Sequence, residues 1–229
     1  MNQKDLQEFP EDIGAESPGE GFYPALDRFS AFSDGVFAIA ITLLVLELPV
    51  PPENVPLLPA LRESWPDFLG YIMSFAFIGG IWLTHSGLTK LMKRGDTVAN
   101  GTNLLLLLLV ALLPFTTSVM VTHLSSPDVG TAVFVYGINL FFASLTLTLL
   151  IRYIAREPSL VADDIADETL QRIARQRWIS IGVNSIAVVM ALILPFVAVG
   201  LYLIQTVLLL VYPLVGMRQS PSRNQRSTR

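Results

Sequence analysis

The chain has 229 residues, of which 52% are apolar and 15% are charged. Soluble domains carry about 25% charged residues, so this composition excludes a disordered or nucleic-acid-binding protein as the first interpretation. There are no cysteines, which excludes disulfide frameworks, thiolate metal sites and cysteine nucleophiles. The formal net charge of −4 hides a very uneven distribution of charge along the chain.

The first 27 residues differ from the rest in composition. They are rich in acids, proline and glycine, with Lys4 as the single base. No apolar run follows a basic start, so the segment does not resemble a secretory signal peptide. We interpret residues 1–27 as a flexible acidic tail. Its acids are Asp5, Glu8, Glu11, Asp12, Glu16, Glu20 and Asp27.

Long apolar stretches follow the tail. A helix that spans a bilayer needs about 20 mostly apolar residues. We expect spans near residues 30–49, 66–87, 100–122, 130–151, 178–198 and 200–217. The last two are separated because residues 179–215 contain no Lys, Arg, Asp or Glu and are too long for one ordinary span. Pro195 and Gly200 favour a break, and we expect a tight turn near Val199.

The basic residues support this count. If the N-terminus is cytoplasmic, all of the 15 Lys and Arg residues except Arg62 fall on the cytoplasmic side, as the positive-inside rule requires. A single span over 179–215 would place the C-terminal arginines outside. The sequence therefore predicts an all-α membrane protein with six transmembrane helices per subunit and both termini cytoplasmic. The transmembrane domain covers residues 28–217, and a basic tail covers 218–229.

The connection 152–177 is the one long cytoplasmic segment. Acids at 163–168 precede the bases Arg172, Arg175 and Arg177. Acidic residues near the start of a helix and basic residues near its end interact favourably with the helix dipole. We expect a cytoplasmic helix here that runs into the fifth span.

The first span contains an unusual carboxylate, Asp34. A carboxylate near the centre of a span costs about 2.5–3.5 kcal/mol, so it needs a partner inside the protein. The candidate partners are Arg28 on the same helix, Trp82 and His85 in the second span, and Asn103 in the third. Polar side chains buried together in lipid satisfy one another, which favours a structural network over a catalytic one. We interpret His85 as a structural histidine rather than a pH-sensitive group.

The opposite side of the first span is apolar. At about 100° per residue, Ile39, Leu43 and Leu46 fall on one narrow stripe, with Thr42 at its edge. An aliphatic stripe in a membrane helix is most often bundle core or lipid contact. Apolar rings that gate a pore by dewetting are a less frequent use of such a stripe.

The first span contains the run Arg28-x-x-x-Phe32-Ser33-Asp34-Gly35 followed by Ala38-Ile39-Ala40-Ile41-Thr42-Leu43. This run resembles the signature of the transmembrane protein 175 potassium channels, in particular the bacterial single-repeat branch. The resemblance covers roughly residues 28–217. Further matches are Trp82-x-x-His85 in the second span, and Asn103 with Pro114-Phe115 in the third.

This resemblance implies a homotetramer in which the first helix of each subunit lines a central pore. It implies that Ile39 forms the narrowest constriction and that Leu43 and Leu46 add further apolar constrictions. Thr42 corresponds to a pore-adjacent threonine linked to potassium preference. The residues that correspond to the family's structural polar network are Arg28, Ser33, Asp34, Trp82, His85 and Asn103.

The expected function is passive conduction of potassium with moderate selectivity over sodium. No Thr-Val-Gly-Tyr-Gly filter occurs, and isoleucine side chains cannot replace the hydration shell of an ion as carbonyls do. Glu47 lies near the outer end of the stripe. Either four Glu47 carboxylates form a ring that concentrates cations at the mouth of the pore, or Glu47 is a simple interfacial residue. We expect membrane lipid and permeant potassium ions as partners, with no nucleic acid, no cofactor and no resident metal.

Three other classes are less consistent with the sequence. A membrane enzyme lacks support because neither Gly-x-Ser-x-Gly nor His-Glu-x-x-His occurs. A secondary transporter of a small solute or ion is the main alternative, although no clear internal repeat is visible. A structural membrane scaffold is the third. We expect the protein in the cell membrane, plasma or inner, as a multi-pass channel.

Overall fold

The computed structural model describes residues 26–162 and 167–218, and the side chains of residues 26–162 and 177–210. Almost all of the predicted acidic tail and basic C-terminal tail lie outside the described residues. The described chain is helical apart from its connections and one isolated bridge, Met92 to Val161. Its elements are α1 (Leu26–Leu44), η1 (Val45–Glu47), α2 (Leu57–Glu63), α3 (Trp65–Thr89), α4 (Thr97–Ala111), α5 (Leu113–Thr122), α6 (Val129–Arg156), η2 (Pro158–Leu160), α7 (Asp167–Ala191) and α8 (Pro195–Arg218).

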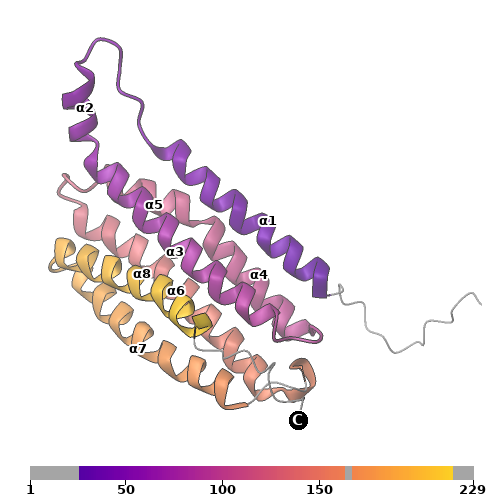
Figure 1. Cartoon of the computed structure of the whole chain (residues 1–229). Coiled ribbons are helices and arrows are strands. Elements are labelled where there is room, and N and C mark those ends of the chain that lie inside the picture. Colours follow the sequence, from indigo (N-terminus) through magenta and orange to yellow (C-terminus); the bar gives the residue numbers. More distant parts are fainter. Residues whose placement is uncertain (1–25, 163–166, 219–229) are drawn as a thin grey trace, which may run out of the picture.

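The long helices lie side by side in an elongated bundle (Figure 1). Helix α1 runs along one edge, against α3 and α4, and α7 runs along the other edge, against α6 and α8. The N-terminal end of α1, the α3–α4 connection and the C-terminal end of α8 lie at the same end of the bundle (Figure 1). Consecutive spans run in opposite directions along the bundle, as is usual for neighbouring helices joined by short connections.

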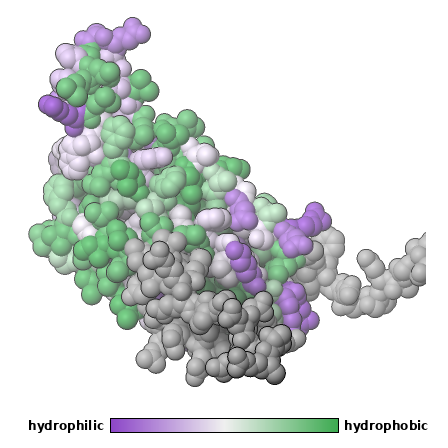
Figure 2. All heavy atoms as spheres, viewed as in Figure 1, coloured by the Kyte–Doolittle hydropathy of each residue, from purple (hydrophilic) through white to green (hydrophobic). Residues whose placement is uncertain are grey.

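Four stretches of the described chain are long and apolar enough to cross a membrane. They are Leu26–Glu47, Trp65–Thr89, Thr97–Thr122 and Val129–Arg156. Two shorter apolar helical stretches follow, Arg177–Ala191 and Pro195–Leu210. Figure 2 shows apolar side chains over the middle of one face and hydrophilic ones toward the ends. An apolar middle between polar ends is the distribution that a bilayer requires.

Two prolines set helix breaks. Pro114 lies in the first turn of α5, so the predicted third span consists of α4 and α5 in tandem. Pro195 begins α8, and the break between α7 and α8 falls at residues 192–194. The predicted turn near Val199 is therefore wrong, because Val199 and Gly200 lie inside α8. Proline is favoured in the first turn of a helix, where its missing N–H has no partner to lose, whereas glycine can continue a helix.

Helix α7 begins at Asp167 and continues to Ala191 without interruption. The helix expected in the 152–177 connection is therefore continuous with the fifth apolar stretch. The acids Asp163 and Asp164, which were expected early in this helix, lie outside the described residues.

The end of α1 also differs from the expectation of one regular helix. The α-helix ends at Leu44, and Val45–Glu47 form a 3₁₀ turn. Prolines at 49, 51 and 52 disfavour a continuing α-helix, and 3₁₀ geometry is common in the last turn. Because a 3₁₀ turn advances about 120° per residue instead of about 100°, Leu46 is rotated about 40° from its predicted position in the stripe.

Close packing joins α6 to α8 at Gly137. A Cβ atom at this position would lie 1.8 Å from Tyr202 Oη and 2.5 Å from Tyr202 Cζ. Tyr202 is fully buried and its ring lies edge-on against Tyr136, with 5.8 Å between the ring centroids. The tyrosine therefore has no room to move aside, and only glycine fits this crossing.

We expect Gly137→Ala to destabilise the protein by about 1–3 kcal/mol, the usual cost of overpacking a core. Thermal unfolding in detergent, followed by tryptophan fluorescence, measures the change. Gly182→Ala is the matched control, because a Cβ at Gly182 has no neighbour within 4 Å. Equal melting temperatures for the two variants would contradict the close-packing argument.

Candidate functional site

Helix α1 buries only one of its faces. Its buried side chains recur at intervals of four or three residues, the spacing of one helix face, and they face α3 and α4. They are Phe29, Ser33, Phe37, Ala40 and Leu44. Only 22% of the α1 span window is buried, compared with 44% to 61% for the three longer spans that follow. Helix α1 is thus the least covered of these spans within the described subunit.

The stripe predicted from the sequence lies on the uncovered side of α1. Ile39 is 60% exposed, Leu43 is 42% exposed and Leu46 is 74% exposed. Thr42 is also exposed, and its hydroxyl donates a hydrogen bond to the carbonyl oxygen of Ile39 at 2.9 Å. Glu47 is exposed in the 3₁₀ turn. The stripe is therefore not part of the core of the described subunit.

A buried chain of hydrogen bonds ties α1 to α3 and α4. His85 Nε2 lies 2.8 Å from Asn103 Oδ1, and Asn103 Nδ2 donates to Ser33 Oγ at 2.9 Å. Ser33 Oγ in turn donates to the carbonyl oxygen of Phe29 at 2.9 Å. All three polar side chains are at most 1% exposed. The structure thus brings together residues of three spans that are up to 70 positions apart.

The chain of bonds has a definite direction. Asn103 offers its oxygen to the ring of His85, so His85 Nε2 carries a proton and donates. His85 Nδ1 is buried and has no hydrogen-bond partner in the part of the chain that the structure describes. His85 therefore takes part in the buried chain of hydrogen bonds through its Nε2–H alone.

Two aromatic side chains enclose His85, and the sequence analysis did not single them out. The ring of Phe29 is stacked at 6.0 Å between centroids, and the ring of Phe37 is tilted at 5.5 Å. Both come from the buried face of α1. The sequence does contain a signal for these two residues. Phe29, Ser33 and Phe37 are spaced four residues apart, which puts all three on one face of the helix.

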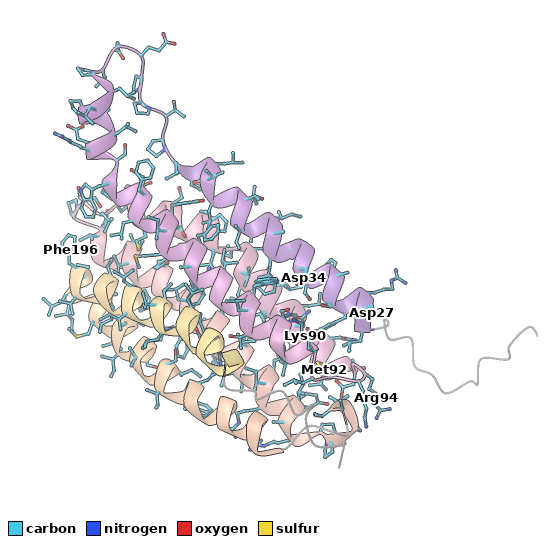
Figure 3. All side chains as sticks on the ribbon, in the orientation of Figure 1. Asp27, Asp34, Lys90, Met92, Arg94 and Phe196 are labelled. Atoms are coloured by element: carbon cyan, nitrogen blue, oxygen red, sulfur yellow. The ribbon has the colours of Figure 1, made fainter. Side chains whose placement is uncertain are left out.

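Asp34 has a different partner from the buried chain. Trp82 Nε1 donates to Asp34 Oδ1 at 2.8 Å, and this contact lies on the exposed side of the α1–α3 pair. Figure 3 marks Asp34 on α1. Arg28 is exposed and has no hydrogen bond or ion pair to the part of the chain described here. Six residues separate Arg28 from Asp34, which places them about 120° apart around the helix.

A second polar cluster, also missed from the sequence, joins α3, α5 and α6. Ser74 Oγ lies 2.7 Å from Thr117 Oγ1 and 3.1 Å from Tyr136 Oη. Because Thr117 donates its own proton to the carbonyl oxygen of Leu113, Ser74 donates to Thr117 and Tyr136 donates to Ser74. Small hydroxyl residues inside apolar spans are the only sequence signal of such a cluster.

No group of three or more His, Cys, Asp or Glu residues that could hold a metal ion occurs among the described residues. Two sets of polar side chains around α1 are instead paired with each other, Asp34 with Trp82 and Ser33 with Asn103 and His85. Their arrangement can hold a helix in a fixed rotation, and it leaves the exposed face of α1 to contact other molecules or ions.

Asn103→Leu should destabilise the subunit by about 1–3 kcal/mol, the cost of a buried donor without a partner, because His85 Nε2 would lose its acceptor. The matched control is Asn100→Leu on the same helix, since the Asn100 side chain has no hydrogen bond within the described residues. Thermal unfolding in detergent measures both. Similar losses for the two leucine variants would show that the buried chain contributes little.

Comparisons with known proteins agree with this architecture. The family model described as "Endosomal/lysosomal potassium channel TMEM175" matches residues 28–114. A protein of Chamaesiphon minutus named as a potassium channel is 34% identical over 177 residues, covering 76% of this chain and 87% of the relative. One of Streptomyces collinus, also named as a potassium channel, is 34% identical over 197 residues, covering 85% and 93%.

A solved structure is similar as well. It is the crystal structure of a lysosomal potassium-selective channel TMEM175 homologue from Chamaesiphon minutus. It aligns with a TM-score of 0.74 at 30% identity and covers 82% of this chain and 97% of its own. With bacterial relatives above 30% identity along most of their length, and with a shared fold, this chain belongs to the TMEM175 family of potassium channels.

Proposed function

We propose that the chain is one subunit of a homotetrameric, potassium-permeable cation channel in the cell membrane, with α1 of each subunit lining a central pore. The observation that carries this proposal is the uncovered face of α1, with Ile39, Leu43 and Leu46 on it. One copy of a helix cannot enclose a pore, so the face needs further copies of the chain. The relatives named as potassium channels support potassium as the permeant ion.

The topology that we propose has six spans and cytoplasmic termini. The spans are α1, α3, the α4–α5 pair, α6, α7 and α8. The shared end of the bundle, where α1 begins and α8 ends, would face the cytoplasm. The described bases at that end support this orientation through the positive-inside rule: Arg28, Lys90, Lys93, Arg94, Arg152, Arg156 and Arg177.

The gate that we propose is a ring of Ile39 side chains, with Leu43 and Leu46 above it. Four apolar side chains around a narrow passage expel water when closed and admit hydrated ions when wider. With the rotation of about 40° in the 3₁₀ turn, Leu46 lies about 20° from Ile39 around the helix and remains in the stripe.

Selectivity in such a pore is moderate, because side chains of this kind cannot replace an ion's hydration shell. Thr42 supports a preference for cations: its proton is donated to the Ile39 carbonyl, so its remaining lone pairs are available to a cation. A ring of Glu47 carboxylates at the mouth would concentrate cations. Ser33, Asp34, Trp82, His85 and Asn103 would set the rotation of α1, with Arg28 outside these contacts.

Ile39→Asn should raise the conductance of the reconstituted channel about tenfold, which corresponds to a barrier lowered by about 1.4 kcal/mol over four side chains. Currents in a potassium gradient across planar bilayers measure this, and wild-type currents should reverse toward the potassium equilibrium potential. Ile39→Met, which keeps the ring apolar, should stay close to wild type.

The control is Ile186→Asn on α7. Ile186 is 61% exposed, nearly the same as Ile39, but lies on a helix that packs against α6 and α8. Unchanged conductance in Ile39→Asn, or an equal increase in Ile186→Asn, would overturn the pore assignment. Transport that saturates at turnover rates would instead favour the alternative, a secondary transporter of a small solute or ion.

Asp34→Ala should reduce the yield of tetramer more than it changes permeation. The substitution removes the acceptor of the Trp82 indole, a hydrogen bond to a charged group worth about 1.5–3 kcal/mol. Size-exclusion chromatography of cross-linked protein measures assembly, and reversal potentials measure selectivity. Asp34→Asn keeps an acceptor oxygen and should assemble better than Asp34→Ala. Normal assembly of Asp34→Ala with altered selectivity would contradict a structural role.

A further inference from the structure

The C-terminal end of α6 presents a hollow that the channel function leaves unused. Leu149, Arg152, Tyr153 and Arg156 line it from α6, at the spacing of one helix face. Trp178 lines it from α7. The hollow is open on one side and has a volume of about 420 Å³. This volume lies within the range of about 300–1,000 Å³ that is usual for small-molecule sites.

The two arginines give the hollow its charge. The guanidinium carbon of Arg152 lies 5.2 Å from the centre of the Trp178 ring, a cation–π contact that holds the group in place. Neither Arg152 nor Arg156 makes a hydrogen bond or ion pair with the described part of the chain. Two like charges four residues apart on a helix repel each other, and an anion between them relieves that repulsion.

Two acids near the hollow lie in the described part of the chain, Asp96 and Glu157, and both accept hydrogen bonds from neutral groups. Tyr153 donates its hydroxyl proton to Asp96 Oδ2, and Asp96 Oδ1 caps the start of α4 through the Ala99 amide. Glu157 accepts a hydrogen bond from Ser159 at 3.1 Å. The dipole of α6 places partial negative charge near Arg156, which compensates one arginine only in part. Asp96 and Glu157 keep their negative charge, because their donors are neutral, but they accept hydrogen bonds from those donors and not from the two arginines. The guanidinium donors of Arg152 and Arg156 have no hydrogen-bond partner in the described part of the chain and are available to an anion.

Hydrogen bonds join the connection between α3 and α4 to the segment that follows α6. Lys93 N donates to the Leu160 carbonyl at 2.9 Å, and Ala162 N donates to the Leu91 carbonyl at 3.0 Å. Arg94 Nε donates to the Ser159 carbonyl at 3.0 Å, so Arg94 is committed to this junction and not to the hollow. Figure 3 marks Met92 and Arg94 at this end of the bundle.

The wall of the hollow is apolar toward the middle of the bundle. Leu149 is 48% exposed and Trp178 is 43% exposed. Ile179, next to Trp178, is 72% exposed. Tryptophan is enriched at the boundary between the apolar core of a membrane and water, and basic residues lie just beyond it. A molecule that fills this hollow therefore needs an anionic head and an apolar tail.

We propose that the hollow binds an anionic glycerophospholipid, with its phosphodiester between Arg152 and Arg156 and an acyl chain along Leu149 and Trp178. Arginine suits this role because its planar group donates two parallel hydrogen bonds to phosphate oxygens. Basic pockets between transmembrane helices are known places for lipid head groups. The site is separate from the α1 stripe and does not depend on which helix lines the pore.

Native mass spectrometry of the full-length chain in detergent tests the proposal. Phosphatidylglycerol should be retained in preference to phosphatidylcholine. Arg152→Gln/Arg156→Gln should weaken retention of phosphatidylglycerol about 30-fold, since each basic group near a membrane surface contributes about a fivefold factor. Arg62→Gln/Lys90→Gln removes the same charge at two exposed positions outside the hollow and should leave retention unchanged.

A second pair of variants separates binding from folding. Arg152→Lys/Arg156→Lys keeps both charges but loses the planar donors, and it should retain lipid to an intermediate extent. Trp178→Leu keeps the wall apolar but removes the ring from Arg152, and it should also weaken retention. Melting temperatures close to wild type for these variants would show that the loss is local.

The outcomes distinguish the lipid from its alternatives. Equal retention of the two lipids, or equal losses in the double glutamine variant and its control, would overturn the proposal. Displacement of phosphatidylglycerol by inorganic phosphate at the same phosphate concentration would assign the hollow to a free anion and overturn the lipid assignment. Retention that resists phosphate and depends on Arg152 and Arg156 would support the lipid.

Discussion

A buried polar group inside a bilayer has no water to bond, so it must find its partners within the protein. The hydrogen-bond chain from His85 through Asn103 to Ser33 meets this requirement between α1, α3 and α4. Because Ser33 must face Asn103, the rotation of α1 about its axis is set. The aromatic rings of Phe29 and Phe37 close around His85 on the same face. The opposite face, with Ile39, is then necessarily turned outward.

Much of this could be predicted from the sequence because apolar length, charge and helical spacing are local properties. The spans, the stripe on α1 and the residue types around Asp34 all follow from them. The pairing did not follow: Asp34 had four candidate partners, and only the packing of α3 against α1 selects Trp82. The break before α8 was placed near Val199 because glycine and proline were weighed together, whereas proline alone sets the start of α8.

The α6–α8 crossing and the outer side of α1 differ in how closely their residues are packed within the described subunit. At the α6–α8 crossing, the absence of a side chain at Gly137 lets Tyr202 fill the space, and the helices pack as a core. At the α1 edge, large apolar side chains remain uncovered. In a membrane protein lipid can cover such a surface, so exposure alone does not define a pore. The proposed pore at α1 therefore rests on two observations together, the low burial of this helix and the relatives named as potassium channels.

In the channel that we propose, assembly and conduction would depend on the same helix, α1. The polar contacts of α1 that we have described are concentrated at Ser33 and Asp34, in the half nearer its N-terminus, while Leu43 and Leu46 lie beyond them and the α-helix ends between these two leucines. The side-chain hydrogen bonds of α1 to its neighbours lie toward one end, while Ala40 and Leu44 pack in the core toward the other. A change of tilt would therefore keep these hydrogen bonds and would require the apolar contacts of Ala40 and Leu44 to repack. The radius of an apolar ring changes with tilt, and wetting of such a ring depends steeply on radius. The contacts that fix the rotation of α1 therefore leave open the motion that a hydrophobic gate needs.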